Sequence, residues 1–211
     1  MQAGNNSLNV ILMILGDLYS WGKSWLSKIN KPGMYEVLEY HSILELKDEE
    51  GRQAKFSKVE IVRFMQNNII AIQDQAWGYQ KDVTNYQCSP GIPVDVYSSG
   101  HKTFVVISLR EVKSKNDEEQ FNLQWDLQGK PIGTHGLWDT YIENYTTIMT
   151  QKIIFPEKRP PIRLWVVEGK QKKHIELNKN KLTQLADRRW QVFWIKKNPR
   201  LYETYTIKWE W

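Results

Sequence analysis

The sequence predicts a mainly β protein, an antiparallel β-sandwich or barrel that follows one N-terminal helix. Three observations support this fold class. Apolar and polar residues alternate over many stretches, which is typical of a strand with one face buried and one in water. Turn-forming Gly, Pro and Asn separate these stretches at the spacing of antiparallel β proteins. The chain also has ten Trp and ten Tyr among its 211 residues, and both residue types favour strands and half-buried surfaces.

The clearest strand is expected between residues 121 and 127, in a hairpin with a strand from Thr103 to Val112. Four of its side chains are predicted to point inward: Phe121, Leu123, Trp125 and Leu127. Earlier strands are expected at Tyr35–Leu46, Phe56–Met65 and Ile69–Trp77, with Leu38 on the inward face of the first.

The stretch from Arg189 to Trp211 contains two alternating runs on either side of Asn198-Pro199. Because Asn-Pro is a turn signal, the two runs are predicted to form a hairpin. Four tryptophans of these runs are expected to face inward together: Trp190, Trp194, Trp209 and Trp211.

Three other segments lack a clear alternation. Residues 78–100 are rich in Gly, Pro, Asn and Ser and are predicted to be irregular, crossed by one short strand at 94–97. Residues 182–187 are predicted to form a helical turn. The segment 129–137 is a candidate sub-domain boundary within an antiparallel β-rich domain that spans 34–211.

The N-terminal helix is expected from Ser7, a capping residue, to about residue 30, before Pro32-Gly33. Residues 8–15 are apolar nearly all round, whereas docking on one sheet uses a stripe about 100° wide. The apolar run breaks at Gly16-Asp17, so it is too short to span a bilayer. The helix is therefore predicted to attach to a protein partner, a second copy of the chain or an anionic membrane surface, with packing on its own β domain as the alternative. The candidate attachment residues are Val10, Ile11, Met13, Ile14, Trp21 and Trp25.

Charge is distributed unevenly along the chain. From residue 152 onward there are fifteen Lys and Arg against six Asp and Glu, a net of +9, whereas residues 1–151 carry a net of −4. A basic C-terminal third is suited to a polyanion such as nucleic acid or anionic lipid, but a solvated strand surface produces the same composition. The candidate polyanion contacts are Lys172, Lys173, Arg188, Arg189, Lys196 and Lys197.

Motifs for catalysis or cofactor binding are not evident in the sequence. No Cys or His pairs have metal-ligand spacing, and neither a Gly-rich phosphate loop nor a Gly-x-Ser-x-Gly elbow occurs. A single cysteine, Cys88, rules out an internal disulfide and favours a reducing, cytoplasmic location, with peripheral membrane attachment through the helix. His135 and Asp139 are more typical of a structural pair than of an acid–base couple. Carboxylates beside aromatic residues are a weak signal for a glycosidase-like pair: Asp95, Asp126, Asp139 and Glu143.

The sequence therefore predicts a non-enzymatic binding or assembly module that uses neither a cofactor nor a metal. An apolar N-terminal helix before a compact β domain is similar to the layout of some membrane-associated effectors of bacterial defence systems and of some pore-forming cytolysins, although the motifs of neither family occur here. That resemblance implies a membrane-acting effector or a pore-forming protein as the alternative. A nucleic-acid or nucleotide-binding β domain that uses the basic third is the other alternative.

Overall fold

The computed structural model describes residues 33–78, 81–99, 102–169, 173–178 and 181–211. Residues 1–33 and 34–211 are separate units of the chain. The predicted N-terminal helix and its six attachment residues lie outside the described residues, and so does Lys172. The described residues are mainly β and contain no α-helix. Within them, no helix is long and apolar enough to cross a bilayer.

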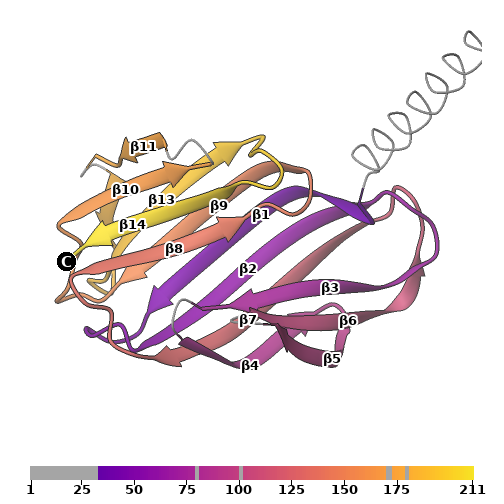
Figure 1. The fold of residues 1–211 in the computed structure, drawn as a ribbon, viewed down its shortest axis with the longest axis horizontal. Coiled ribbons are helices and arrows are strands. Elements are labelled where there is room, and N and C mark those ends of the chain that lie inside the picture. Colours follow the sequence, from indigo (N-terminus) through magenta and orange to yellow (C-terminus); the bar gives the residue numbers. More distant parts are fainter. Residues whose placement is uncertain (1–32, 79–80, 100–101, 170–172, 179–180) are drawn as a thin grey trace, which may run out of the picture. The chain divides into compact units, whose positions relative to one another are not determined.

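The strands form three sheets (Figure 1). The large sheet contains β1 (Tyr35–Leu46), β2 (Gln53–Phe64), β4 (Lys81–Ser89), β7 (Glu118–Gly129), β9 (Thr146–Phe155), β12 (Leu182–Gln184) and β13 (Trp190–Lys197). Its strand order is β12-β13-β9-β1-β2-β7-β4. A four-stranded sheet has the order β11-β10-β14-β8, built from β8 (His135–Tyr141), β10 (Arg163–Glu168), β11 (Lys173–Glu176) and β14 (Thr204–Glu210). A three-stranded sheet has the order β3-β6-β5, built from β3 (Ile69–Trp77), β5 (Ile92–Ser99) and β6 (Lys102–Lys113).

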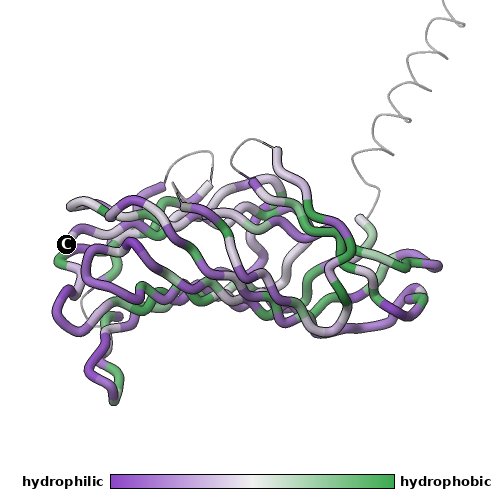
Figure 2. The backbone as a smooth tube through the Cα atoms, turned by 90° about the horizontal axis from the view of Figure 1, so that it is seen from below, coloured by the Kyte–Doolittle hydropathy of each residue, from purple (hydrophilic) through white to green (hydrophobic). Residues whose placement is uncertain are grey.

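Both small sheets cover the same face of the large sheet. On β2, alternate residues share a face, and Phe56 belongs to the core shared with the four-stranded sheet, whereas Val62 belongs to the core shared with the three-stranded sheet. On β7, Trp125 and Phe121 are divided between the same two cores. Figure 2 shows hydrophobic and hydrophilic positions alternating along the chain, as this layering requires.

The inward faces of two predicted strands are confirmed. Phe121, Leu123, Trp125 and Leu127 are at most 2% exposed. In β14, Tyr205, Ile207 and Trp209 are buried, and Trp190, Trp194 and Trp211 pack against the same core as Trp209. The first strand has the predicted bounds, but its register shifts between Val37 and Glu39, so a bulge removes Leu38 from the buried face.

The barrel alternative is wrong, because every sheet is open and ends in two edge strands. The strand pairs are antiparallel except for β1 and β9, which run parallel. The C-terminal hairpin is also wrong. β13 pairs with β9 and β12 in the large sheet, whereas β14 pairs with β10 and β8 in the four-stranded sheet, so the turn at Asn198-Pro199 carries the chain from one layer to the other.

Two segments contain more strand than the sequence predicted. Residues 78–100 contain the whole of β4 and β5, and the predicted short strand at 94–97 lies within β5. The register of β4 shifts between Thr84 and Gln87, and that of β5 shifts between Pro93 and Asp95. Both are edge strands, where a missing second neighbour makes Pro and bulges tolerable. Residues 182–187 contain the edge strand β12 and a turn in place of the predicted helical turn.

Gly136 allows the edge strand β8 to approach β14 closely in the four-stranded sheet. It lies opposite Trp209 in the ladder between β8 and β14, and a Cβ atom there would overlap the indole ring. We expect Gly136→Ala to lower the free energy of unfolding by roughly 1–3 kcal/mol, because the buried tryptophan has to move. Urea denaturation measures this loss. The matched control is Gly133→Ala, where a Cβ atom meets nothing within 4 Å; equal losses in both variants would contradict the packing argument.

Candidate binding cleft

The inward face of β2 carries two charged residues in the middle of an apolar series. Phe56, Lys58, Glu60 and Val62 share this face, and the charged pair separates the two cores described above. Lys58 and Glu60 therefore lie under the seam between the two small sheets. A third charged residue, Asp74, occupies a buried position of β3 at the edge of the three-stranded sheet.

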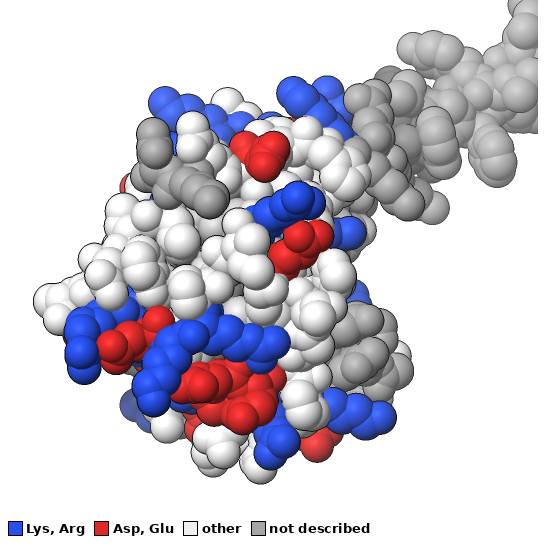
Figure 3. Space-filling model, turned by 90° about the vertical axis from the view of Figure 1, so that its left-hand side faces the viewer, with Lys and Arg blue, Asp and Glu red and all other residues white. Residues whose placement is uncertain are grey.

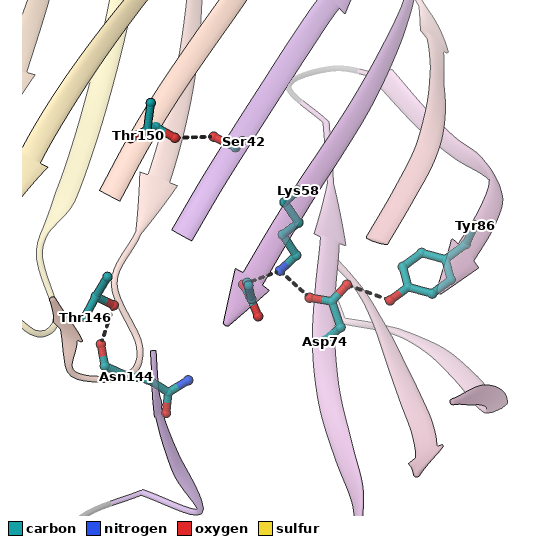
Figure 4. Close-up of polar contacts among 8 residues, drawn as sticks. Ser42, Lys58, Asp74, Tyr86, Asn144, Thr146 and Thr150 are labelled. Atoms are coloured by element: carbon teal, nitrogen blue, oxygen red, sulfur yellow. Dashed lines mark hydrogen bonds and ion pairs between the residues drawn. The ribbon is translucent and has the colours of Figure 1, made fainter. Parts of the chain in front are cut away.

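These three residues form a buried ion network (Figure 4). The Lys58 Nζ atom lies 2.6 Å from Asp74 Oδ1 and 2.9 Å from Glu60 Oε1. The Tyr86 hydroxyl, from β4, donates to Asp74 Oδ2 at 2.7 Å. Lys58, Glu60 and Asp74 are 7–8% exposed. The network ties the three-stranded sheet to the large sheet through Asp74.

The network holds Lys58 in its charged form. Burial alone would lower the pKa of this ammonium, but the attraction of Asp74 and then of Glu60 outweighs it, so the pKa lies well above the usual value. Two carboxylates share one ammonium, and the network therefore carries a net negative charge. An anionic ligand would have to compete with both carboxylates for Lys58.

The ion network forms part of the wall of a cleft with a volume of about 90 Å³. Residues of β1, β2, β3, β7 and β8 and of the segment 142–146 line it, so both small sheets and the large sheet contribute. The acidic residues of the lining differ in burial. Glu60 and Asp74 are buried, Asp139 is half-buried, and Glu143 is exposed. The lining contains these four carboxylates and one ammonium, that of Lys58.

Aromatic residues make up half of the remaining lining. Trp138 stacks on Trp77 with ring centroids 5.0 Å apart, and it also packs on Phe56 at 4.7 Å. Two of the protein's own ammonium groups already lie near tyrosine rings here: Lys58 Nζ is 5.8 Å from the Tyr40 ring centroid, and Lys102 Nζ is 5.7 Å from that of Tyr141. The combination of carboxylates and aromatic faces is suited to a cation.

Comparison with known proteins gives a likeness in fold alone. No family model matches this sequence, and no curated protein does. The crystal structure of an M1 zinc metallopeptidase from Deinococcus radiodurans aligns with a TM-score of 0.50 and 9% identity over 82% of this chain and 42% of that enzyme. A mutant of the same enzyme, and that mutant bound to a Tyr-Ser-Ala substrate, each align with a TM-score of 0.51 at 9% identity and the same coverage. This chain thus spans less than half the length of these enzymes.

The five candidate polyanion contacts among the described residues lie in separate places. Arg188 and Arg189 lie just before β13, where Arg188 Nε is 3.2 Å from Glu157 Oε1 and Arg189 pairs with Asp187 and Glu45. Lys196 and Lys197 lie at the other end of β13.

Carboxylates accompany several of these cations. Lys196 Nζ is 2.7 Å from Glu168 Oε2, and Lys173 of β11 lies opposite the same glutamate in the ladder. Figure 3 shows Lys and Arg lying against Asp and Glu on the end of the unit that it draws. The positive charge counted along the sequence is therefore partly neutralised in space.

The other candidate residues have separate partners. His135 Nε2 lies 3.4 Å from Glu210 Oε1, whereas Asp139 accepts a hydrogen bond from Thr206, so the structure does not pair His135 with Asp139. Of the four carboxylates noted beside aromatic residues, Asp139 and Glu143 meet in the cleft. Cys88 is half-buried, and burial followed by the charge of Asp74 raises the pKa of its thiol. No group of three or more His, Cys, Asp or Glu in the described part of the chain is arranged to hold a metal ion.

Lys58, Glu60 and Asp74 were not predicted from the sequence to form a site. A signal for them was present, because charged residues at inward positions of an alternating strand need a partner or an opening. Lys58 and Glu60 interrupt the apolar face of β2 in that way, and Asp74 lies between Ile72 and Ala76 on β3.

The tyrosines beside the network predict a loss of stability at high pH. Burial raises the pKa of Tyr40 from 10.0 to about 12 against the opposing charge of Lys58, and Glu60 acts in the same direction as burial. Burial, followed by the charge of Glu60, raises the pKa of Tyr35 further. In the unfolded chain tyrosine ionises near its usual pKa, so the folded state retains more protons between pH 10.0 and about 12. The free energy of unfolding should therefore be constant below this window and fall as the pH rises through it. The raised pKa of Lys58 acts in the same direction, starting above its usual value of 10.5.

Urea denaturation at a series of alkaline pH values tests this expectation. Tyr40→Phe should make the decline less steep, whereas the control Tyr202→Phe, at a residue 58% exposed, should leave it unchanged. An identical pH profile for the wild type and Tyr40→Phe would show that this ring titrates normally.

Proposed function

We propose that residues 34–211 form a non-enzymatic binding module whose cleft receives an ammonium group presented by a protein partner. The observation that carries this proposal is the charge of the lining, four carboxylates against one ammonium, within aromatic walls. Lys102 lies beside Tyr141, a lining residue. If its ammonium is counted too, two ammonium groups still face four carboxylates. An incoming cation would relieve this excess of negative charge.

The size of the cleft favours a compact cation. An apolar cavity of about 150 Å³ accommodates benzene, so the 90 Å³ here has room for about four heavy atoms. That is enough for an ammonium group and the last carbons of an alkyl chain. Cation–π contacts strengthen when the cation loses water, as it would between the rings of Trp77 and Tyr141.

Acceptor capacity remains for such a group. Asp74 uses both oxygens, one for Lys58 and one for Tyr86, and Glu60 uses one for Lys58. Glu143, in contrast, makes no hydrogen bond or ion pair with any of the described residues, and its charge acts on nearby Tyr35. We therefore expect Glu143 to contact the incoming ammonium, with Glu60 and Asp74 contributing longer-range attraction.

Calorimetric titration of the full chain with two small probes tests the proposal. Nα-acetyl-lysine N-methylamide offers only a side-chain ammonium, and norleucine amide offers only an α-ammonium, so the tighter binder identifies the source of the cation. Binding should weaken with added salt, because part of the cleft is open to solvent. Nα-acetyl-norleucine N-methylamide, which has no ammonium, should bind at least about tenfold more weakly than the better probe.

The variant Glu143→Gln keeps the size of the side chain and removes its charge. It should weaken binding of the ammonium probe by roughly fivefold, an effect of about 1 kcal/mol for a partly exposed ion pair. Glu111→Gln, at an exposed carboxylate of β6, is the matched control and should leave binding unchanged. Equal binding of the charged and neutral probes would contradict the proposal.

The proposed attachment through residues 7–30 is a separate part of this function. It remains a prediction, since those residues lie outside the described part. Deleting residues 1–30 should leave a folded β unit that has lost self-association or affinity for anionic vesicles. An unfolded remainder, from an intact chain that is monomeric and does not bind vesicles, would instead make the segment part of the core.

A further inference from the structure

Two edge strands of different sheets border the charged cleft. β8 is an edge of the four-stranded sheet, and β3 is an edge of the three-stranded sheet. Residues of both strands line the cleft, whereas their ladder partners β14 and β6 contribute no lining residue, and no ladder joins β8 to β3. In Figure 1, β1 and β2 of the large sheet are visible between the two strands. The open edge of β8, on the side away from β14, therefore adjoins the cleft.

The backbone groups on this open edge can be identified from the hydrogen bonds at the end of β8. The Ile142 N–H donates to the Glu203 carbonyl at 3.0 Å, and the Ile142 carbonyl accepts from the Tyr202 N–H at 2.8 Å, so both groups of Ile142 point toward the side of β14. In an antiparallel ladder, successive residues direct their backbone groups to opposite edges of the strand. The N–H and C=O groups of Asp139 and Tyr141 therefore point away from β14, toward the cleft that both residues line.

A lysine of the protein itself already reaches this edge. Lys102 Nζ, from β6, lies 3.2 Å from Gln75 Oε1 of β3 and 5.7 Å from the centroid of the Tyr141 ring. The Tyr141 side chain points outward and is 43% exposed, whereas that of the preceding Thr140 is buried. The contact that Lys102 makes across the cleft consists of one flexible side chain, which an incoming segment could displace.

We infer that the partner presents its ammonium on a lysine within an extended segment, and that this segment pairs antiparallel with the open edge of β8. The inference rests on the proposed ammonium site, whose four carboxylates attract the lysine, while the edge of β8 supplies main-chain hydrogen bonds. Antiparallel pairing is the more stable kind, and residues directly opposite each other in it point to the same face. Segment residues bonded to Asp139 and Tyr141 therefore point outward as those two side chains do. A lysine between them points inward, into the cleft.

Calorimetric titration of the full chain compares the heptapeptide acetyl-Thr-Val-Thr-Lys-Thr-Val-Thr-amide with Nα-acetyl-lysine N-methylamide, which has the same ammonium without the extended segment. We expect the heptapeptide to bind at least about tenfold more tightly, because it adds several main-chain hydrogen bonds. If the small probe binds and the heptapeptide binds no more tightly, the inference is overturned and the ammonium site stands. Equal binding of the heptapeptide and its norleucine analogue would instead contradict the ammonium site, whereas the backbone pairing has readouts of its own.

Methylation of the peptide backbone locates its hydrogen bonds. Methyl groups on the nitrogens of the two threonines that flank the lysine remove donors that face β8, and should weaken binding by at least about tenfold. The matched control carries its two methyl groups on the nitrogens of the lysine and of the second valine. Because those N–H groups face away from β8 in the antiparallel arrangement, the control should bind as the unmethylated peptide does. Equal losses in the two peptides, or the reverse order, would overturn the inference.

Amide hydrogen exchange, followed by NMR, identifies the strand that the peptide joins. In the free protein the amides of Asp139 and Tyr141 should exchange faster than that of Thr140, which faces β14. The bound heptapeptide should slow exchange at Asp139 and Tyr141 by at least about tenfold, and the small ammonium probe should not.

The amide of Glu176 is the matched control for this measurement. It lies on β11, the other edge of the same sheet, and it points away from β10 because the neighbouring Leu177 N–H donates to the Leu164 carbonyl. Exchange at Glu176 should stay fast when the heptapeptide is bound. Slowing at Glu176 equal to that at Tyr141, or protection confined to amides of β3 or β5, would overturn the inference.

Discussion

Replacing Lys58 by methionine is expected to lower the free energy of unfolding at neutral pH by roughly 3–5 kcal/mol, because it leaves two buried carboxylates without their cation. Glu60 and Asp74 are 8% and 7% exposed, so water cannot replace the lost ammonium fully. Methionine preserves most of the side-chain volume, which separates the electrostatic loss from a packing loss.

Urea denaturation measures this effect, and two controls show its origin. Lys47→Met removes an ammonium that pairs with Glu45 at the surface, with a side chain 43% exposed, and should cost less than about 1 kcal/mol. Replacing all three charges, with Lys58→Met, Glu60→Met and Asp74→Leu, should recover much of the stability, since an apolar set can substitute for a buried ion network. A loss for Lys58→Met no larger than that for Lys47→Met would mean that the network is solvated.

Replacing Trp125 by alanine is expected to cost a similar amount, roughly 3–5 kcal/mol. This residue of β7 is 2% exposed and packs on Phe56 and Tyr86, with ring centroids 4.5 and 5.9 Å away. Removing the indole leaves a cavity beneath the cleft, and the surrounding strands cannot collapse to fill it without breaking their hydrogen bonds. Thermal and urea denaturation should give the same loss.

Trp165→Ala is the matched control for this change. Trp165 is only half-buried, on the face of β10 opposite to buried Leu164 and Val166, so its removal should cost less than half as much. A loss below about 1 kcal/mol for Trp125→Ala would show that the inward face of β7 contributes little to stability.

Local alternation predicted the strands that are buried on one face, but it missed the edge strands β4 and β12 and part of β5. Residues 121–127 could be assigned because every second side chain meets an opposing sheet. β4 contains Asn85 and β5 contains Pro93, which an edge strand tolerates, so their composition resembled that of a loop. The predicted hairpin of β13 and β14 was wrong for a different reason. A turn between two alternating runs indicates a hairpin only if both runs join the same sheet, and the pairing of β13 with β9 depends on residues far away in the sequence.

The candidate cleft could be predicted only in part. Asp139 and Glu143 were noted from the sequence, and both line it. Lys58 and Glu60 were recognisable as charged interruptions of an apolar face, but their partner Asp74 lies on another sheet. The excess of carboxylates over ammonium groups in the cleft therefore could not be predicted, because the charged residues come from strands of three different sheets.

The ammonium site in the cleft is the central claim, and intermolecular NOEs test it most directly. With Nα-acetyl-lysine N-methylamide or norleucine amide bound to the full chain, the methylene or methine protons next to the ammonium should give NOEs to the ring protons of Trp77 and Tyr141, which line the cleft from β3 and β8. The same NOEs should disappear when salt displaces the probe. NOEs only to rings outside the cleft, such as Tyr202 or Phe193, or no NOEs from a probe that binds, would contradict the assignment of this cleft as the binding site.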